Sequence, residues 1–530
     1  MTVEMACRWM LGAGFCCVVR LAAGQQSDAD VNFRANTGLV EISVIAEVKQ
    51  RDDKPAKPIT DLRREDFQIF DNGVRQEIRL FIAPAGTTAD LALDDRMEAR
   101  QPEGFTNRAL RSRTPHSGYS AIVFDNLVTD FGDPFGGGAA NKEGTGFGAQ
   151  KVLQALAEIT PGERIAIYAL GRKLRVISEF TADREMVRER LRAWKPSPDD
   201  AKTGTALCIA EPPPGAKPTP GQQEAIDSCV RNDSLQRQWP YDVEMEAIAD
   251  HMAGIPGRKN LILMANQFPV SGRALRKLID ADVAVYTVDE AGVNAYGGVP
   301  GYISKLTGGL KYARRNDLEV AVREAVEDGR SAYILGFYQP ASDANPFGAD
   351  LPAGPHQIAI RVSRPDIRPE RLQLRYRTSY QTQTVSAHPN ASVLDLIEAL
   401  NRPVDATAIG ITASVTRTEN RIHLMESLDV SGLDLQLEQG FWKGRAEVVA
   451  RFLTAEGMWD GDAVAETLTL NLKASTYESA LERGLPYSKD LTIPPKAVAL
   501  KLLTGSVTSG KIGTLTIPLS EVRAAGTDGK

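Results

Sequence analysis

The stretch YSAIVFDNLVTD, residues 119–130, indicates the fold class of the central part of the chain. Its residues Ala121 to Phe124 form an unbroken apolar run, which is typical of a strand buried on both faces of a parallel sheet. The run ends on Asp125 and gives way to a more polar stretch. In such sheets ligands bind at the carboxyl ends of the strands, so Asp125 is the first candidate binding residue.

Short apolar runs alternate with helical periodicity throughout residues 119–330. The strand is followed by an amphipathic segment, GAQKVLQALAEIT, then by the apolar run RIAIYAL and by a helix that we expect Asp183 to cap. The run NLILMANQF places Asn266 at a further strand end. Strands that alternate with helices predict a Rossmann-like α/β domain, with a mainly parallel sheet covered by helices on both faces.

The residues outside this region follow the two-residue alternation of β-strands. Asp71-Asn72-Gly73 is typical of a hairpin turn, and the many short C-terminal strands predict a β-sandwich. The fold class is therefore multidomain, α/β plus β. The predicted boundaries are 1–24 for a signal peptide, 36–85 for an N-terminal β module, 86–118 for a linker, 119–330 for the α/β domain, 331–380 for strands that are either separate or complete the N-terminal module, 381–407 for a linker with a short helix, and 408–525 for the sandwich.

The N-terminus and the cysteines indicate an exported protein, located in the periplasm, at the cell surface or outside the cell. Arg8, the apolar run Trp9–Val19 and the small residues up to Gly24 have the pattern of a secretory signal peptide, with a buried helix as the alternative. Cys208 and Cys229 flank a Pro-rich loop, so we expect a disulfide between them, with two free thiols as the alternative. No later segment has the roughly 18 apolar residues of a transmembrane helix.

Composition and motifs argue against several classes of function. The net charge of −6 provides no attraction to nucleic acid, and 6% aromatic residues leave little surface for base stacking. The sequence has no Gly-x-Ser-x-Gly elbow, and its five histidines lack metal-cluster spacing. The Gly-rich loop 131–151 lacks the phosphate-loop motif and is either a binding loop or a segment without fixed structure. We therefore expect neither an enzyme nor a nucleic-acid-binding protein.

Three passages carry a resemblance to a known family. They are VKQRDDKPAKPITDLRREDFQIFDNGVRQEIRLF (48–81), HMAGIPGRKNLILMANQFP (251–269), and SAYILGFYQP with HQIAIRVSRPD (331–340 and 356–366). The middle region resembles a von Willebrand factor type A domain. The chain as a whole resembles a family of large secreted bacterial proteins, often found in Acidobacteria, that carry such a domain at the centre.

The resemblance implies a metal-ion-dependent adhesion site, which this sequence matches only in part. Asp125 and Thr129 stand where the family has its first Asp and second Ser. Leu127 replaces the first Ser and has no oxygen to offer, and Asn266 replaces a charged Asp. A hard cation binds more weakly when charged oxygen ligands are lost, so the cofactor to expect is a weakly held Mg²⁺ or Mn²⁺. The alternative is that Asp125 only accepts hydrogen bonds from backbone amides at the strand end.

The function that follows from the resemblance is protein–protein interaction or adhesion through a type A-like domain with a degenerate metal site. The protein ligand is unidentified. A metal-free structural scaffold of an envelope assembly is the alternative function. The residues expected to contact the partner are Asp125, Asn126, Asp130, Asn266 and Gln267.

Overall fold

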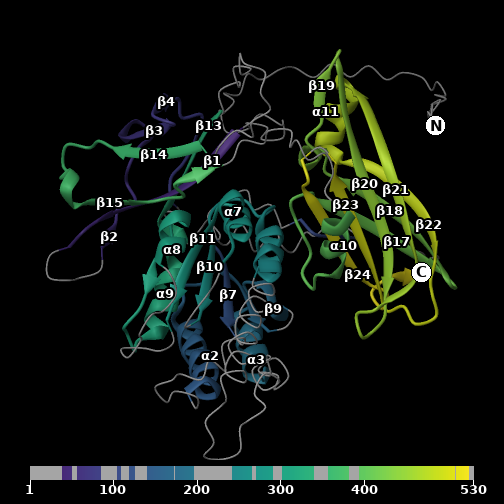
Figure 1. The fold of residues 1–530 in the computed structure, drawn as a ribbon, viewed down its shortest axis with the longest axis horizontal. Coiled ribbons are helices and arrows are strands. Elements are labelled where there is room, and N and C mark those ends of the chain that lie inside the picture. Colours follow the sequence, from purple (N-terminus) through teal and green to yellow (C-terminus); the bar gives the residue numbers. More distant parts are fainter. Residues whose placement is uncertain are drawn as a thin grey trace, which may run out of the picture. The chain divides into compact units, whose positions relative to one another are not determined.

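The structure is a computed structural model of the chain (Figure 1). It describes residues 39–50, 56–84, 104–108, 118–125, 140–171, 174–195, 242–265, 270–289, 301–338, 356–380, 393–507 and 509–524. Within these residues no helix is long and apolar enough to cross a membrane. The mixed α/β and β-rich composition expected from the sequence is confirmed.

The α/β region is built on one six-stranded sheet, and β7 lies inside it. Five strands are parallel, and only the edge strand β9 runs antiparallel, against β8. The carboxyl ends of the parallel strands therefore meet at one edge of the sheet. In spatial order the strands are β12 (Lys311–Tyr312), β11 (Val283–Val288), β10 (Lys259–Met264), β7 (Tyr119–Asp125), β8 (Arg164–Leu170) and β9 (Arg175–Thr181).

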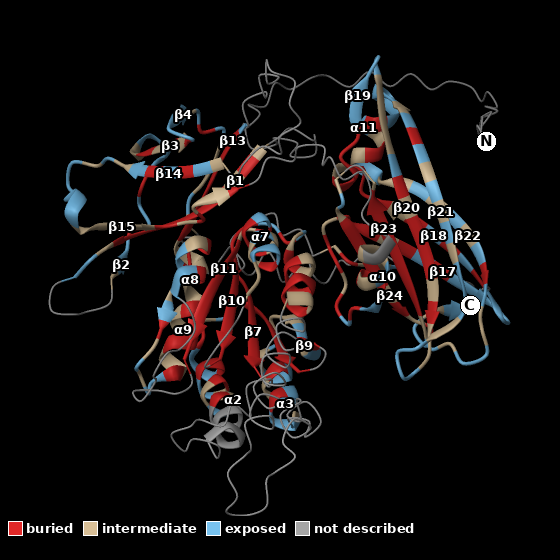
Figure 2. Cartoon of the chain, in the orientation of Figure 1, coloured by how far each residue is buried: buried red, intermediate tan, exposed pale blue. Residues whose placement is uncertain are grey.

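Helices cover both faces of this sheet, because successive side chains of a strand point to opposite faces. Ala121 and Val123 of β7 face a core shared with a helix over 242–252 and with α7 (Gly272–Asp280) and α8 (Gly301–Thr307). The opposite face of β7 packs in a second core, with α2 (Ala140–Glu158), α3 (Arg184–Ala193) and α9 (Leu318–Glu327). Figure 2 shows the central strands buried throughout.

The predicted cap of α3 is confirmed. Asp183 has extended backbone angles, and its side chain accepts a hydrogen bond from the Met186 amide at 3.0 Å. Ser271 caps α7 in the same way, through the Ala274 amide at 3.3 Å. Each such cap contributes about 1 kcal/mol to the stability of its helix.

Strands from both sides of the α/β region pair within two further sheets. One has the order β15-β1-β13-β5, with β2 on β1, and the other has the order β16-β14-β3-β4. Asn72 and Gly73 form the predicted turn between β3 and β4 with φ of 47° and 82°. The strands are β1 (Leu39–Val48), β2 (Lys57–Pro58), β3 (Phe67–Asp71), β4 (Val74–Gln76), β5 (Leu80–Ile82), β13 (Ala332–Tyr338), β14 (His356–Val362), β15 (Leu372–Arg375) and β16 (Ser379–Tyr380).

The run RLQLRYRTSY, residues 371–380, alternates as a single strand would, but the structure divides it into β15 and β16, which lie in different sheets. The chain leaves the first sheet after Arg375, and the Thr378 amide donates to the Leu306 carbonyl at 3.2 Å. Gly308 packs directly against the Tyr376 backbone, so this crossing is determined by contact with the α/β region.

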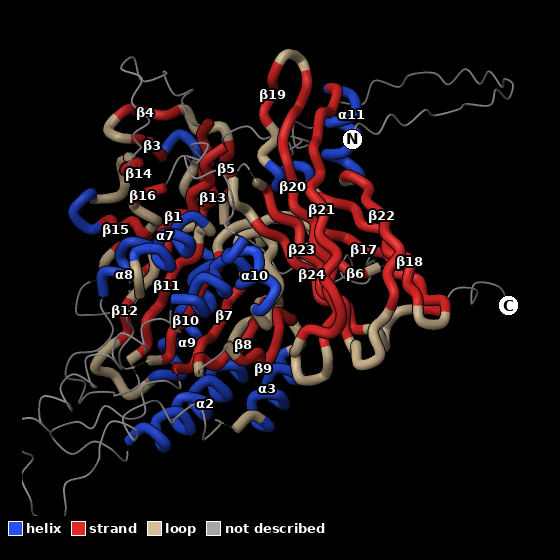
Figure 3. The backbone as a smooth tube through the Cα atoms, turned by 45° about the vertical axis from the view of Figure 1, so that its right-hand side comes forward, coloured by secondary structure: helices blue, strands red, loops and turns tan. Residues whose placement is uncertain are grey.

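The C-terminal residues form two sheets that enclose an apolar core. Figure 3 shows the strands of these sheets gathered in one part of the chain. Strand β6 (Phe105–Thr106) pairs with β17, although its residues were expected to be linker. The sheets have the orders β22-β18-β17-β25 with β6, and β19-β20-β23-β24 with β21. Their strands are β17 (Ile411–Thr418), β18 (Arg421–Leu428), β19 (Gln436–Glu438), β20 (Phe441–Leu453), β21 (Trp459–Lys473), β22 (Leu485–Thr492), β23 (Ala499–Ser506), β24 (Ile512–Pro518) and β25 (Arg523–Ala524).

Two helices accompany these sheets. α10 (Val393–Asn401) lies where a short helix was predicted, and its Leu400 packs with Leu503 of β23. α11 (Ala474–Arg483) was not predicted, because its sequence lies between two strand-like runs. It forms because Tyr477 is buried and stacks on Trp442, with ring centroids 4.1 Å apart.

Candidate functional site

The carboxyl edge of the α/β sheet holds Asp125, the first candidate binding residue of the sequence analysis. It is the last residue of β7, pairs with Leu170 of β8, and is only 9% exposed. The preceding Phe124 stacks on Trp194 at 5.5 Å, which fixes the end of the strand. A carboxylate therefore lies just below the protein surface, at the position where parallel α/β sheets bind ligands.

A second buried carboxylate, Asp289, follows β11 at the same edge and was not singled out by the sequence reasoning. It is 3% exposed, and its amide donates to the Tyr312 carbonyl at 2.9 Å. The sequence pattern that located Asp125 is also present here, because the apolar run VAVYTV is followed by Asp289 just as AIVF is followed by Asp125. Strand β10 separates the two aspartates. Just beyond the end of β10, the Ala265 amide donates to the Val288 carbonyl at 3.2 Å.

The other residues named for this edge lie outside the described part of the chain. They remain predictions, as do the signal peptide over 1–24 and the disulfide. Within the described residues, no group of three or more His, Cys, Asp or Glu side chains could hold a metal ion. The residues concerned are Asn126, Leu127, Thr129, Asp130, Asn266, Gln267, Cys208 and Cys229.

A buried ion network lies at the opposite, amino ends of the parallel strands. Arg375 of β15 donates to both oxygens of Glu47 at 2.8 and 3.1 Å, and to both oxygens of Asp328 at 2.6 Å. Although burial opposes it, these hydrogen bonds raise the pKa of Arg375 above its ordinary value. Nearby, burial lowers the pKa of Lys259 to about 8, and its ammonium donates to the Ile255 carbonyl. This network joins β1 and β15 to the base of the α/β region.

Another polar cluster joins three strand ends in the second β sheet. Asp71 is 3% exposed and accepts from His356 Nδ1 at 2.8 Å and from the Tyr380 hydroxyl at 2.8 Å. Burial and the Asp71 carboxylate raise the pKa of Tyr380. The Asn72 side chain accepts from the Gln357 amide at 2.9 Å, which completes the junction. Through these hydrogen bonds the cluster ties β3, β14 and β16 together.

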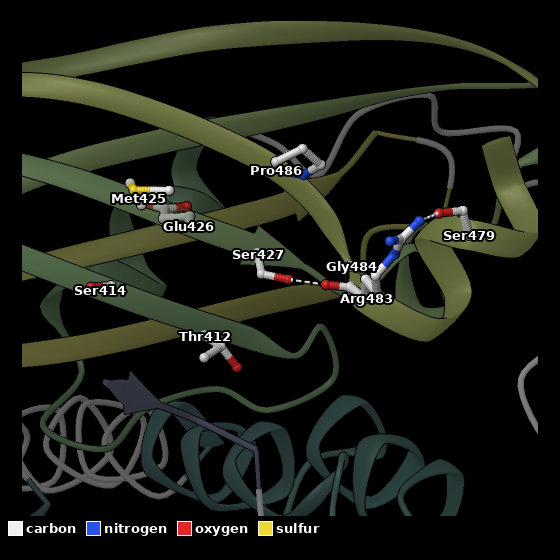
Figure 4. Close-up of a pocket in the computed structure, with 9 residues that line it drawn as sticks. All are labelled: Thr412, Ser414, Met425, Glu426, Ser427, Ser479, Arg483, Gly484 and Pro486. Carbon is white, nitrogen blue, oxygen red and sulfur yellow. Dashed lines mark hydrogen bonds between the residues drawn. The ribbon is translucent and has the colours of Figure 1, made fainter. Parts of the chain in front are cut away.

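A hollow of about 470 Å³ lies on the C-terminal sheet between β17, β18, β22 and α11 (Figure 4). The Ser427 hydroxyl donates to the Arg483 carbonyl at 2.6 Å and so closes the end of α11 onto β18. Gly484 is required there, because its φ is +78° and an added Cβ would lie 2.0 Å from Ser427 Oγ. The polar lining includes Thr412, Ser414, Ser427 and Ser479.

Comparisons with known proteins give the following. No model of a protein family matches the chain, and no curated protein matches it. Among solved structures it is similar to proximal thread matrix protein 1 from the mussel byssus, at 10% identity over 40% of this chain and 48% of that one, with a TM-score of 0.23. It is also similar to the von Willebrand factor domain of the type V pili tip protein Mfa5 from Porphyromonas gingivalis, at 18% identity over 28% and 38%, with a TM-score of 0.17.

A third similar structure is a von Willebrand factor type A protein from Catenulispora acidiphila, at 11% identity over 78% of this chain and 68% of that one, with a TM-score of 0.22. The chain spans 48% and 38% of the first two structures, less than half of either. At these TM-scores the likenesses carry no functional conclusion.

Proposed function

We propose that this is an exported protein–protein interaction or adhesion protein, and that the carboxyl edge of its α/β sheet is the recognition surface. The observation that carries the proposal is the position of Asp125, a carboxylate held at the end of an interior parallel strand. Below it the sheet is buried on both faces, so the edge is built on a rigid base. Loops that follow such strand ends are common recognition elements.

Recognition at the proposed surface depends little on a metal ion. Leu127 has no ligand atom and Asn266 has no charge, so Asp125 is the one charged ligand among the matched positions. Mg²⁺ needs near-octahedral oxygen ligands and loses its water reluctantly. A cation at this edge would therefore bind weakly, and an acidic group of the partner would have to complete its coordination.

Calorimetric titration of Mg²⁺ and Mn²⁺ into the mature protein tests the metal part of the proposal. We expect weak heats that disappear in Asp125→Ala and persist in Asp462→Ala, which removes an exposed carboxylate on β21. If neither ion produces heat in any variant, recognition at this edge is metal-independent. Heats that survive Asp125→Ala would place any cation site elsewhere.

The adhesion part is tested by binding of the labelled mature protein to cells of the source organism that lack its gene. Saturable binding that Asp125→Ala weakens, and that Asp462→Ala does not, supports the proposed surface. Saturable binding that is equal in all variants would assign recognition to another part of the chain. Absence of saturable binding with Mg²⁺, Mn²⁺ or a chelator would overturn the adhesion proposal.

The second candidate function is a metal-free structural scaffold of an envelope assembly. The buried ties of Arg375 to Glu47 and Asp328 favour it, because they join the β sheets firmly to the α/β region. A scaffold predicts that the protein from the source organism elutes in a large complex that chelators leave intact. If the protein is an adhesion protein, we expect it to elute free of other proteins and to bind its partner when the two are mixed.

A further inference from the structure

The bridging segment, residues 398–407, joins the α/β region to the C-terminal sandwich. Its Thr407 amide donates to the Asp250 carbonyl at 3.0 Å, at the end of the helix over 242–252. Thr407 Oγ1 accepts from the Gly254 amide at 2.8 Å and donates to the His251 carbonyl at 2.8 Å. A Cβ on Gly254 would lie 2.0 Å from the backbone carbonyl oxygen of Thr407, so the two backbones are in close contact.

Charged side chains strengthen this contact. Arg402 is almost fully buried and donates to Asp250 at 2.5 Å and to Glu398 at 2.8 Å. Lys277 of α7 reaches the same Asp250 carboxylate at 2.7 Å. Asp250 therefore receives one cation from the α/β region and one from the bridging segment.

The other side of the bridging segment is tied to the sandwich. The buried Lys501 of β23 donates to the Arg402 carbonyl at 2.6 Å. Asp405 accepts from the Thr516 amide at 2.8 Å and from the Thr514 hydroxyl at 3.1 Å. A change that weakens the contact between the bridging segment and the α/β region therefore also weakens the attachment of the sandwich.

The His251 ring lies at the centre of this contact, and both of its nitrogens face an oxygen. Nδ1 lies 2.6 Å from the Asp405 carbonyl, in the bridging segment. Nε2 lies 3.3 Å from Oε2 of Glu179 on β9, a distance at which a charged ring forms an ion pair, although the alignment is not that of a hydrogen bond. The ring is stacked on Phe180 at 5.7 Å, which limits its rotation.

This geometry favours one protonation state. A neutral imidazole has a single N–H, so one of its nitrogens would turn a lone pair toward an oxygen. Only the imidazolium can present an N–H to the Asp405 carbonyl and another to Glu179. The contact with the bridging segment is therefore strongest when His251 carries a positive charge.

The groups around the His251 ring also favour its charged form. Burial alone would lower the pKa of His251, but Glu179, followed by the Asp405 carbonyl and carboxylate, outweighs burial and raises it above its ordinary value of 6.5. Tyr168 of β8 lies edge-on to the ring and donates to Glu179 at 3.3 Å. Lys501 stands 3.5 Å from the Asp405 carboxylate, and Asp250 precedes His251 on its own helix.

We propose that His251 is a protonation-dependent latch, which holds the bridging segment and the C-terminal sandwich on the α/β region more tightly while its ring is charged than when the ring is neutral. Glu179 belongs to the α/β region and faces the ring whether or not the segment is docked, so the Asp405 carbonyl and carboxylate are the groups that link the proton to docking. They favour the charged ring only in the docked state, so docking is strongest at low pH and weakens, by at most about tenfold per pH unit, as the ring loses its proton.

Hydrogen exchange on the full chain between pH 5.5 and 9 tests the latch. The readout is the protection factor, corrected for intrinsic exchange, of peptides that cover 250–254 and 404–408. Peptides of β23 in the same samples report any opening of the sandwich itself. We expect protection at both contact peptides to fall several-fold across the range in the wild type, and to be flat in His251→Gln, which is uncharged throughout.

Two further variants make the result decisive. Glu179→Gln removes the charge beside Nε2 and should move the loss of protection to lower pH. His423→Gln is the matched control, because its exposed pairing with Asp490 lies on β18 and β22; it should leave the wild-type profile unchanged. A flat wild-type profile, or a pH-dependent loss that persists in His251→Gln and is unmoved by Glu179→Gln, would overturn the latch.

Discussion

Glu426 gives the sharpest prediction about stability. It lies on the inward-facing positions of β18, between Ala413 of β17 and Tyr487 of β22, and is 3% exposed. Neither carboxylate oxygen has a hydrogen-bond partner among the described residues. Burial alone raises the pKa of Glu426 to about 8 from 4.5.

The magnitude and sign of the effect follow from this pKa. Between pH 4.5 and 8 the folded state keeps a proton that the unfolded state has released, so stability falls as the pH rises. At about 1.4 kcal/mol per pKa unit, the loss is roughly 3 kcal/mol at pH 7 and about 5 kcal/mol at most above pH 8. Glu426→Gln keeps the shape and stays neutral, so the variant should equal the wild type near pH 4.5 and exceed it increasingly above.

The assay is hydrogen exchange of peptides from β17 and β18, which reports the free energy of opening of the sandwich without assuming that the whole chain unfolds in one step. Glu438→Gln is the control, because its carboxylate is exposed on β19 of the same sandwich. Equal protection of wild type and Glu426→Gln at pH 8, or a gain that does not shrink toward pH 4.5, would refute the reasoning.

Three further predictions concern the framework. Arg375→Ala leaves two buried carboxylates without their cation and should lower the free energy of unfolding by about 3–5 kcal/mol, whereas Arg364→Ala, at an exposed pair, should cost under about 1 kcal/mol in the same denaturant titration. Gly484→Ala introduces both a clash and an unfavourable φ, and should lower the melting temperature of the sandwich by several degrees, a cost of about 1–3 kcal/mol. Cys208 and Cys229 should be found in one disulfide-linked peptide pair by mass spectrometry of the unreduced protein; free thiols at both would contradict this.

The joint domain of the two flanking β segments, 36–85 and 331–380, remains a proposal. The structure pairs β1 with β13 and β3 with β14, so limited proteolysis that cuts the α/β region should leave the two segments associated. A nicked sample in which they separate under native conditions would count against the joint domain.

Local pattern determined much of the fold. The apolar run of β7, the cap at Asp183 and the Asn72-Gly73 turn each depend on residues close together in the chain, so the sequence predicted them correctly. Asp125 could be located for the same reason, because a strand end is a local feature. Asp289 follows an equally apolar run, so its place at a strand end was also a local feature that the sequence could have predicted.

Tertiary structure alone decided which distant residues meet. Nothing local shows that β6 pairs with β17 or that His251 faces Asp405 across 154 residues. Nor does anything local show that the Glu426 carboxylate has no hydrogen-bond partner among the described residues. The sequence determined the strands, helices and caps, whose energies come from neighbours within a few residues. The pairings, the latch and the buried carboxyl depend on burial and contact between segments far apart in the chain, and these exist only when the whole fold has formed.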